Sequence, residues 1–169
     1  MAETPWARNL GAAKMAVTYV QSKMDIGASN KIGIGMIAKA MCAGGTFNKG
    51  ELRSKVDQDL AQISSPKWRD VLYLSADWAK HYGCGNCGEQ SALAFVYLKQ
   101  LGILPLDWMQ IGNFKHAFVI IGRNGDSDPS DFNTWSKSSV VCDPWGGRAE
   151  PKLYIGIWNW KPNLLHREE

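Results

Sequence analysis

The hydrophobic pattern of the chain changes at Pro105. Before it, apolar residues recur at helical spacing, and after it, short runs of β-branched and aromatic residues are separated by turn residues. Helices followed by strands, rather than alternating with them, are typical of α+β proteins. A chain of 169 residues corresponds to about one domain. We therefore expect one α+β domain over residues 1–169, with a helical lobe over 1–82 and a buried helix packed on an antiparallel sheet over 83–169.

The elements of this domain are predicted from spacing and from turn residues. The helices are expected over Pro5–Lys23, Lys31–Cys42, Thr46–Ile63, Ser65–His81 and Cys87–Leu101. Ser65 and Pro66 form the expected N-cap and first position of the fourth helix. The strands are expected over Trp108–Ile111, His116–Ile121, Ser138–Cys142 and Tyr154–Trp160. The polar residues 124–137 predict a surface loop.

Composition excludes several classes of protein. Hydrophobic residues make up 45% of the chain and charged residues 21%, as in ordinary globular domains. The net charge of +3 comes from scattered basic residues, so no nucleic-acid partner is expected. No apolar stretch is long enough for a membrane span, and the first residues do not resemble a signal peptide. Export, if it occurs, is expected to use another route.

Cys87 is the first candidate for chemistry. It follows Gly83-Cys84-Gly85-Asn86 and opens the most apolar predicted helix. Glycines allow a ligand to approach the backbone closely, and the positive end of a helix dipole favours the thiolate form of a cysteine. The position therefore predicts a nucleophile. Taken alone, a cysteine at a helix start is more often a small buried hydrophobe.

Two further residues complete a possible catalytic set. His116 opens an apolar strand, and Asp143 closes another strand just before Pro144. An imidazole can serve as acid and base for a thiol, and a carboxylate can fix the tautomer of that imidazole. Each residue also has an ordinary structural explanation. Their occurrence together, in the order Cys, His, Asp, predicts a catalytic triad.

Three segments carry a resemblance to a known family. The segments GNCGEQSALAFVYL, KHAFVIIG and VVCDPWGG resemble the Cys, His and Asp blocks of bacterial papain-like cysteine hydrolases. These include YopT-like effector proteases, dermonecrotic-toxin-type glutamine deamidases and papain-fold domains of polymorphic toxins. The resemblance implies a papain-like fold, with Cys87 as nucleophile, His116 as general acid and base, and Asp143 as the residue that orients the imidazole. No cofactor or metal is implied.

The resemblance also implies a biological setting. A toxin or effector of this family acts through a thioester on an amide of a target protein in a host or competitor cell, as a deamidase, protease or transglutaminase-like enzyme. It implies delivery by a specialised secretion system, action in the target-cell cytosol or alternatively the periplasm, and an immunity protein or chaperone as a further partner. The three blocks specify the catalytic machinery better than the substrate.

The oxyanion site departs from the papain pattern. Papain has a glutamine six residues before its nucleophile, and the corresponding position holds His81. Either His81 takes that role, or backbone N–H groups near Asn86 and Cys87, helped by Gln90, hold the oxyanion. We favour the backbone groups, because a helix start offers free donors. Trp145, two residues after Asp143, either covers the His–Asp pair, forms a pocket wall or belongs to the core.

Competing interpretations of the same residues remain open. Cys84, Cys87, Cys142 and His116 could form a Cys3His zinc site, although the second short-spaced ligand pair is missing. A reversible disulfide of Cys84 with Cys87 or Cys142 could silence the nucleophile. A peptidoglycan peptide amidase would use the same nucleophile and base. A non-catalytic binding module of papain-like fold could instead contact a partner through the loop over 124–137.

Overall fold

The computed structural model describes residues 3–26, 42, 50–113, 115–159 and 161–169. Within these residues the chain forms four α-helices and an open sheet of five antiparallel strands, which confirms the α+β class. The helices are α1 (Pro5–Lys23), α3 (Glu51–Leu60), α4 (Trp68–Tyr82) and α5 (Cys87–Gln100). The strands are β1 (Leu106–Ile111), β2 (His116–Ile121), β3 (Val140–Asp143), β4 (Arg148–Pro151) and β5 (Pro162–Glu168). Two 3-10 helices are η1 (Phe132–Thr134) and η2 (Lys152–Trp158).

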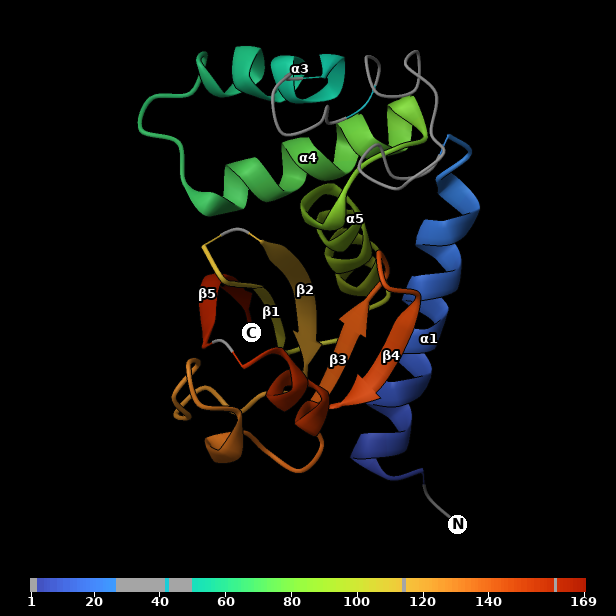
Figure 1. The fold of residues 1–169 in the computed structure, drawn as a ribbon, viewed down its shortest axis with the longest axis vertical. Helices are drawn as coiled ribbons and strands as arrows, with labels where there is room; N and C mark the ends of the chain where they lie inside the picture. Colours follow the sequence, from blue (N-terminus) through green and yellow to red (C-terminus); the bar gives the residue numbers. More distant parts are fainter. Residues whose placement is uncertain (1–2, 27–41, 43–49, 114, 160) are drawn as a thin grey trace.

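The sheet has the strand order β4-β3-β2-β1-β5 (Figure 1). Strands β1 and β2 form a hairpin in which Ile111 lies opposite His116. Strand β3 pairs with β2 so that Ile120 lies opposite Val141. This register brings the first residue of β2 and the last residue of β3 toward the same end of the sheet, because antiparallel strands run in opposite directions.

The two faces of the sheet are covered differently. Helices α1 and α5 pack on one face, where Val119, Ile121 and Cys142 join Phe95 of α5 in the larger core. Alternate residues of the same strands point to the other face, as the strand period of two requires. There they pack against residues from the 3-10 segments, and the buried members are Met109, Ile111, Phe118, Ile120, Trp135, Val141 and Ile155.

The remaining helices form a lobe beside the sheet. Helix α4 packs against α5, and α3 packs against α4, so α3 is separated from the sheet by the other two helices (Figure 1). In the described part of the chain, no helix has both the length and the apolar character needed to cross a bilayer. The helix expected over Lys31–Cys42 lies outside the described residues except for Cys42.

The bounds predicted for two helices, Thr46–Ile63 and Ser65–His81, need correction. The first of them ends at Leu60 rather than at Ile63. Helix α3 begins at Glu51, and the four residues before Gly50 in the prediction lie outside the described residues. Helix α4 begins at Trp68 rather than at Pro66, because Ser65 has a left-handed φ of 57°. The carboxylate of Asp70 accepts the backbone N–H of Lys67 at 2.8 Å, and this bond closes the helix start two residues later than expected.

The C-terminal strands were predicted incorrectly. Tyr154–Trp160 was expected to be a strand, but residues 152–158 form the 3-10 helix η2, and Asn159 has a left-handed φ of 49°. Ile155 of this helix is buried in the second core cluster, so packing of that side chain outweighs the β propensity of the segment. The strands on either side, β4 and β5, carry several charged residues and gave no alternating apolar signal.

Candidate active site

Cys87 occupies the first position of α5 and is partly exposed. The preceding loop approaches the helix closely: a Cβ atom at Gly85 would lie 2.6 Å from the Cβ of Glu89. Only glycine fits this approach without a shift. The amide of Gln90 donates to the carbonyl oxygen of Gly85 at 2.8 Å, which fixes the loop from the other side. The thiol is therefore held on a rigid helix start.

His116 joins the other two candidate residues. Its Nε2 atom lies 2.9 Å from Oδ2 of Asp143, and its side chain also hydrogen-bonds with Cys87. Since Asp143 occupies Nε2, Nδ1 is the ring nitrogen left for the thiol. The His116 side chain is 13% exposed and that of Asp143 is 3% exposed. The structure thus brings Cys87, His116 and Asp143 together from α5, β2 and β3.

The charge of His116 follows from this geometry. Burial lowers its pKa, but the hydrogen bonds and negative charges of Asp143 and Cys87 raise it more, and the pKa rises from 6.5 to about 9. His116 is therefore an imidazolium at neutral pH. Because the pKa of His116 is higher in the folded chain than in the unfolded chain, the protonated imidazole stabilises the folded state. This stabilisation is complete below pH 6.5 and is lost as the pH rises through about 9.

The pH behaviour gives a prediction that needs no substrate. Followed by NMR of the imidazole ring, His116 should titrate with a midpoint near pH 9. The Asp143→Asn variant should lower this midpoint, because it removes the negative charge bonded to Nε2. The exposed His81 supplies an internal reference signal in the same spectra. An unchanged midpoint in the variant would show that the His–Asp bond does not set the charge of His116.

Asp143 is held by the turn between β3 and β4. Its Oδ1 atom accepts the backbone N–H of Gly146 at 3.1 Å. A Cβ atom at Gly146 would lie 2.7 Å from Oδ2, the oxygen bonded to His116. The turn therefore leaves no room for a side chain next to the carboxylate.

Gly146→Ala should displace the Asp143 carboxylate and weaken its bond to His116. Because small misplacements of catalytic groups are costly, we expect activity to fall about tenfold to a hundredfold. Gly11→Ala is the matched control, since a Cβ atom there meets no atom within 4 Å. The two variants are compared by the midpoint of the His116 titration and by activity on the substrate that mass spectrometry identifies. Equal values for both variants would contradict the expectation.

Trp145 lies against the His116 ring. The two ring centroids are 5.6 Å apart with an interplanar angle of 63°, an edge-to-face contact. The ring of Phe118 stacks on another side of His116 at 6.2 Å. Trp145 is half-buried, so it covers the histidine and still faces the surface. This geometry corresponds to one of the three positions that the sequence left open for Trp145, the one that covers the histidine.

The oxyanion candidates have different surroundings. The backbone N–H of Asn86 donates to Oε2 of Glu89 at 2.9 Å, so it is already used. The Gln90 amide is used by Gly85. His81 packs edge-on against Trp78 and Tyr82 on its own helix, and the bonds that join the three candidate residues do not involve it. The backbone N–H of Cys87, at the first turn of α5, fits the expected donor best.

Two residues of this region were missed by sequence reasoning. Glu89, in the first turn of α5, forms an ion pair with Arg53 of α3 at 2.8 Å. The spacing of Asn86 and Glu89 is that of a capping box, and it could have indicated the bond between them. Nothing in the sequence near Arg53 indicates its contact with α5, which depends on the packing of the helical lobe.

The cysteines contradict two alternatives. Cys84 forms a disulfide with Cys42, so in this structure it is paired with neither Cys87 nor Cys142, and the alternative of a latch through Cys84 is not formed. Cys142 is buried, its thiol contacts the carbonyl oxygen of Ala13, and burial raises its pKa. The Cys3His zinc set is therefore not assembled, because Cys84 is oxidised and Cys142 points into the helix-covered core.

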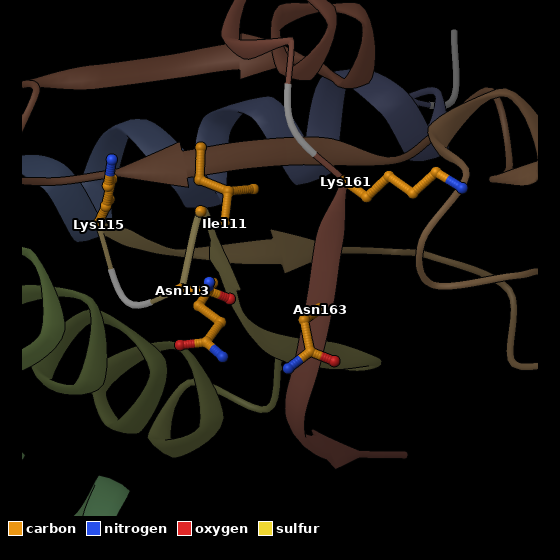
Figure 2. A pocket seen from close by; sticks show the side chains of 7 residues that line it. Ile111, Asn113, Lys115, Lys161 and Asn163 are labelled. Atoms are coloured by element: carbon orange, nitrogen blue, oxygen red, sulfur yellow. The ribbon is translucent and has the colours of Figure 1, made fainter.

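A hollow of about 430 Å³ lies between the end of the β1–β2 hairpin and the start of β5. Ile111 of the lining lies opposite His116 in the hairpin, and Lys115 directly precedes it. Figure 2 shows Lys115 and Lys161 extending in different directions from the rim. The lining residues are Gln110, Ile111, Gly112, Asn113, Lys115, Lys161 and Asn163. Amide and ammonium side chains thus line this hollow.

Neither the protein-family models nor the curated proteins compared with the chain give a match.

Proposed function

We infer that the protein is a cysteine-dependent amide hydrolase with a papain-like arrangement of its active site. The observation that carries this proposal is the hydrogen-bonded series Cys87, His116, Asp143, in which the histidine is charged at neutral pH. A binding module would not require a partly exposed thiol beside a buried imidazolium. Perturbed titratable groups of this kind are characteristic of catalytic sites.

The first half of the reaction forms a thioester. The imidazolium of His116 stabilises the thiolate of Cys87, whose Sγ attacks the carbonyl carbon of the substrate amide. The backbone N–H of Cys87 donates to the developing oxyanion at the positive end of α5. His116 gives its proton to the nitrogen of the leaving group as the C–N bond breaks. The leaving group departs as ammonia or as an amine.

The second half releases the acyl group. Neutral His116 takes a proton from water, and the water oxygen attacks the thioester carbon. The C–S bond breaks, the carboxylic acid is released, and the charged pair of Cys87 and His116 is restored. Asp143 keeps the imidazole in one orientation throughout, and Trp145 restricts access of bulk water to it. An amine in place of water gives transglutamination.

The proposed setting follows from the family resemblance. The three blocks around Cys87, His116 and Asp143 support a bacterial toxin or effector that acts on an amide of a target protein. The hollow at the end of the β1–β2 hairpin, which Lys115 lines directly before His116 in the sequence, offers a polar recess for a further part of the target. Delivery by a specialised secretion system belongs to the same proposal.

A second candidate is a peptidase or amidase that acts on peptidoglycan peptides. The disulfide between Cys42 and Cys84 favours it, because structural disulfides persist in the periplasm and are rare in reducing cytosol. In a periplasmic enzyme this bond would stay oxidised and Cys87 would stay free, because Cys84 is already bonded to Cys42 and Cys142 is buried.

The experiment that tests the function compares both substrate classes. Purified protein and its Cys87→Ala variant are incubated with a cytosolic extract and with peptidoglycan fragments, and the products are read by mass spectrometry. Deamidated glutamine, ammonia-loss crosslinks or new chain termini that depend on Cys87 support the proposal. Unchanged spectra for both substrate classes, from protein whose Cys87 is intact, would favour the binding module.

The compartment of action has its own expected result. If the disulfide belongs to the active form, bacteria that express the chain with a periplasmic signal should stop growing, whereas cytosolic expression should be tolerated. Cys42→Ser in the periplasmic form should weaken the effect by freeing the loop before Cys87. Toxicity confined to cytosolic expression would instead support the cytosolic target. The Cys87→Ala variant is the control in both compartments.

A further inference from the structure

Arg53 of α3 is tied to Glu89, in the first turn of α5, by an ion pair that the triad does not contain. Its Nε and Nη2 atoms lie 2.8 Å and 3.5 Å from the two carboxylate oxygens of Glu89. The Glu89 side chain is 8% exposed, and that of Arg53 is 41% exposed. Glu89 also accepts the N–H of Asn86, the residue before Cys87. One carboxylate thus links α3 to the backbone next to the thiol.

The negative charge of Glu89 disfavours the thiolate form of Cys87. A buried carboxylate two residues after Cys87, in the same first turn, repels a thiolate. The same carboxylate is needed to bond the Asn86 N–H. A positive partner that remains bound to Glu89 removes this conflict, because it offsets the charge and leaves the bond in place.

We propose that Arg53 is a positioning residue for Cys87: it holds Glu89 against the start of α5 and offsets the charge of Glu89 beside the thiolate. This rests on the proposed function of Cys87. It goes beyond the triad because Arg53 comes from the helical lobe. Helix α3 then serves catalysis through a single side chain.

The electrostatic surroundings agree with this role. Burial lowers the pKa of Arg53, but Glu89 and, more weakly, Cys87 and Asp57 raise it overall, so Arg53 stays charged. Among the described residues, His116 of β2 interacts with the thiol, and Asp143 of β3 is bonded to the far side of the imidazole. Two cations, His116 and Arg53, thus act on the charge of Cys87, and each is paired with its own carboxylate.

The test measures the rate at which iodoacetamide alkylates Cys87 as a function of pH, with the site of labelling read by peptide mass spectrometry. The non-reduced protein suits this assay, because Cys42 and Cys84 form a disulfide and Cys142 is buried. Arg53→Gln should slow alkylation at pH 7 about tenfold and move the profile to higher pH, since the Glu89 charge is no longer offset. Glu89→Gln should move the profile to lower pH.

The combined variants separate charge from structure. Arg53→Gln with Glu89→Gln should return the profile close to that of the unmodified protein, and Arg53→Lys should keep most of the rate. Lys55→Gln, which removes a charge from the same helix without touching the ion pair, is the control. If Arg53→Gln does not fold, Glu89→Gln alone still tests the expected shift to lower pH. A purely structural role predicts slower alkylation in both single variants and no recovery in the double variant.

The outcome distinguishes this inference from the proposed function. If Cys87 of the unmodified protein is alkylated only at the rate of an ordinary exposed thiol, Cys87 is not an activated nucleophile. That result overturns the proposed function and this inference together. Fast alkylation that Arg53→Gln leaves unchanged overturns the role of Arg53 alone. Shifts of the two single variants in the same direction also overturn it.

Discussion

Cys87→Ala is expected to abolish activity, with a loss of about a thousandfold or more, while the fold stays intact. The covalent route disappears with the thiol, and removal of one sulfur atom from a partly exposed position leaves no large cavity. Activity is measured on the substrate identified by mass spectrometry, and folding is checked by circular dichroism and by Tm. A variant that retains activity would show that the chemistry lies elsewhere.

The other two residues of the triad provide graded comparisons. His116→Ala should be nearly as severe as Cys87→Ala, because the acid and base of both half-reactions is lost. Asp143→Ala should leave a measurable residual rate, since Asp143 acts by orienting His116. Cys142→Ala is a control for loss of a thiol outside the site, as Cys142 is buried among core residues. Equal and mild effects at all three positions would favour the binding module.

The largest effect on stability is expected at Asp107. This carboxylate is fully buried and binds two arginines: Arg123 at 2.7 Å and Arg167 at 2.8 Å. Arg123 is also almost completely buried, and it donates to the carbonyl oxygen of Ser127 at 2.9 Å. One carboxylate thus joins β1 to β5 and to the loop after β2.

Asp107→Asn should lower the free energy of unfolding by about 3–5 kcal/mol, because two arginines lose their shared counter-charge in a buried place. For a chain of this length, this corresponds to a fall in Tm of about 10 °C or more. Thermal and urea unfolding measure the change, and Asp77→Asn on the exposed side of α4 is the matched control. If the Tm values of the two variants agree within about 2 °C, the network contributes little.

The parts of the fold that follow from periodicity were predicted well. Helix α1 has the predicted bounds, α5 ends one residue early, and β2 spans the predicted residues. These elements have one continuous apolar face or run, so local pattern and tertiary packing agree. Strand β5 was missed for the opposite reason: beside two adjacent leucines it carries polar residues without an alternating pattern, and one of them, Arg167, bonds the buried Asp107 of β1.

The site was predictable to the extent that its residues lie at element ends. Each residue of the triad begins or ends a helix or a strand: Cys87 begins α5, His116 begins β2 and Asp143 ends β3. Their residue types, and their order in the sequence, therefore indicated the site. The pairing of Cys42 with Cys84 was not predictable, because 42 residues separate them and the choice of partner depends on how the helical lobe folds back. The partner of Glu89 was missed for the same reason.

The disulfide between Cys42 and Cys84 also closes a covalent ring that contains α3 and α4. The ring runs from Cys42 through α3 and α4 to Cys84, and residues 61–67, between the two helices, are exposed. A protease that cuts this connection would nick the chain without dividing it, because the two pieces would remain linked through sulfur. Arg53 would stay attached to the piece that carries Cys87. Separation of the two pieces would thus require two events, cleavage of the chain and reduction of the disulfide.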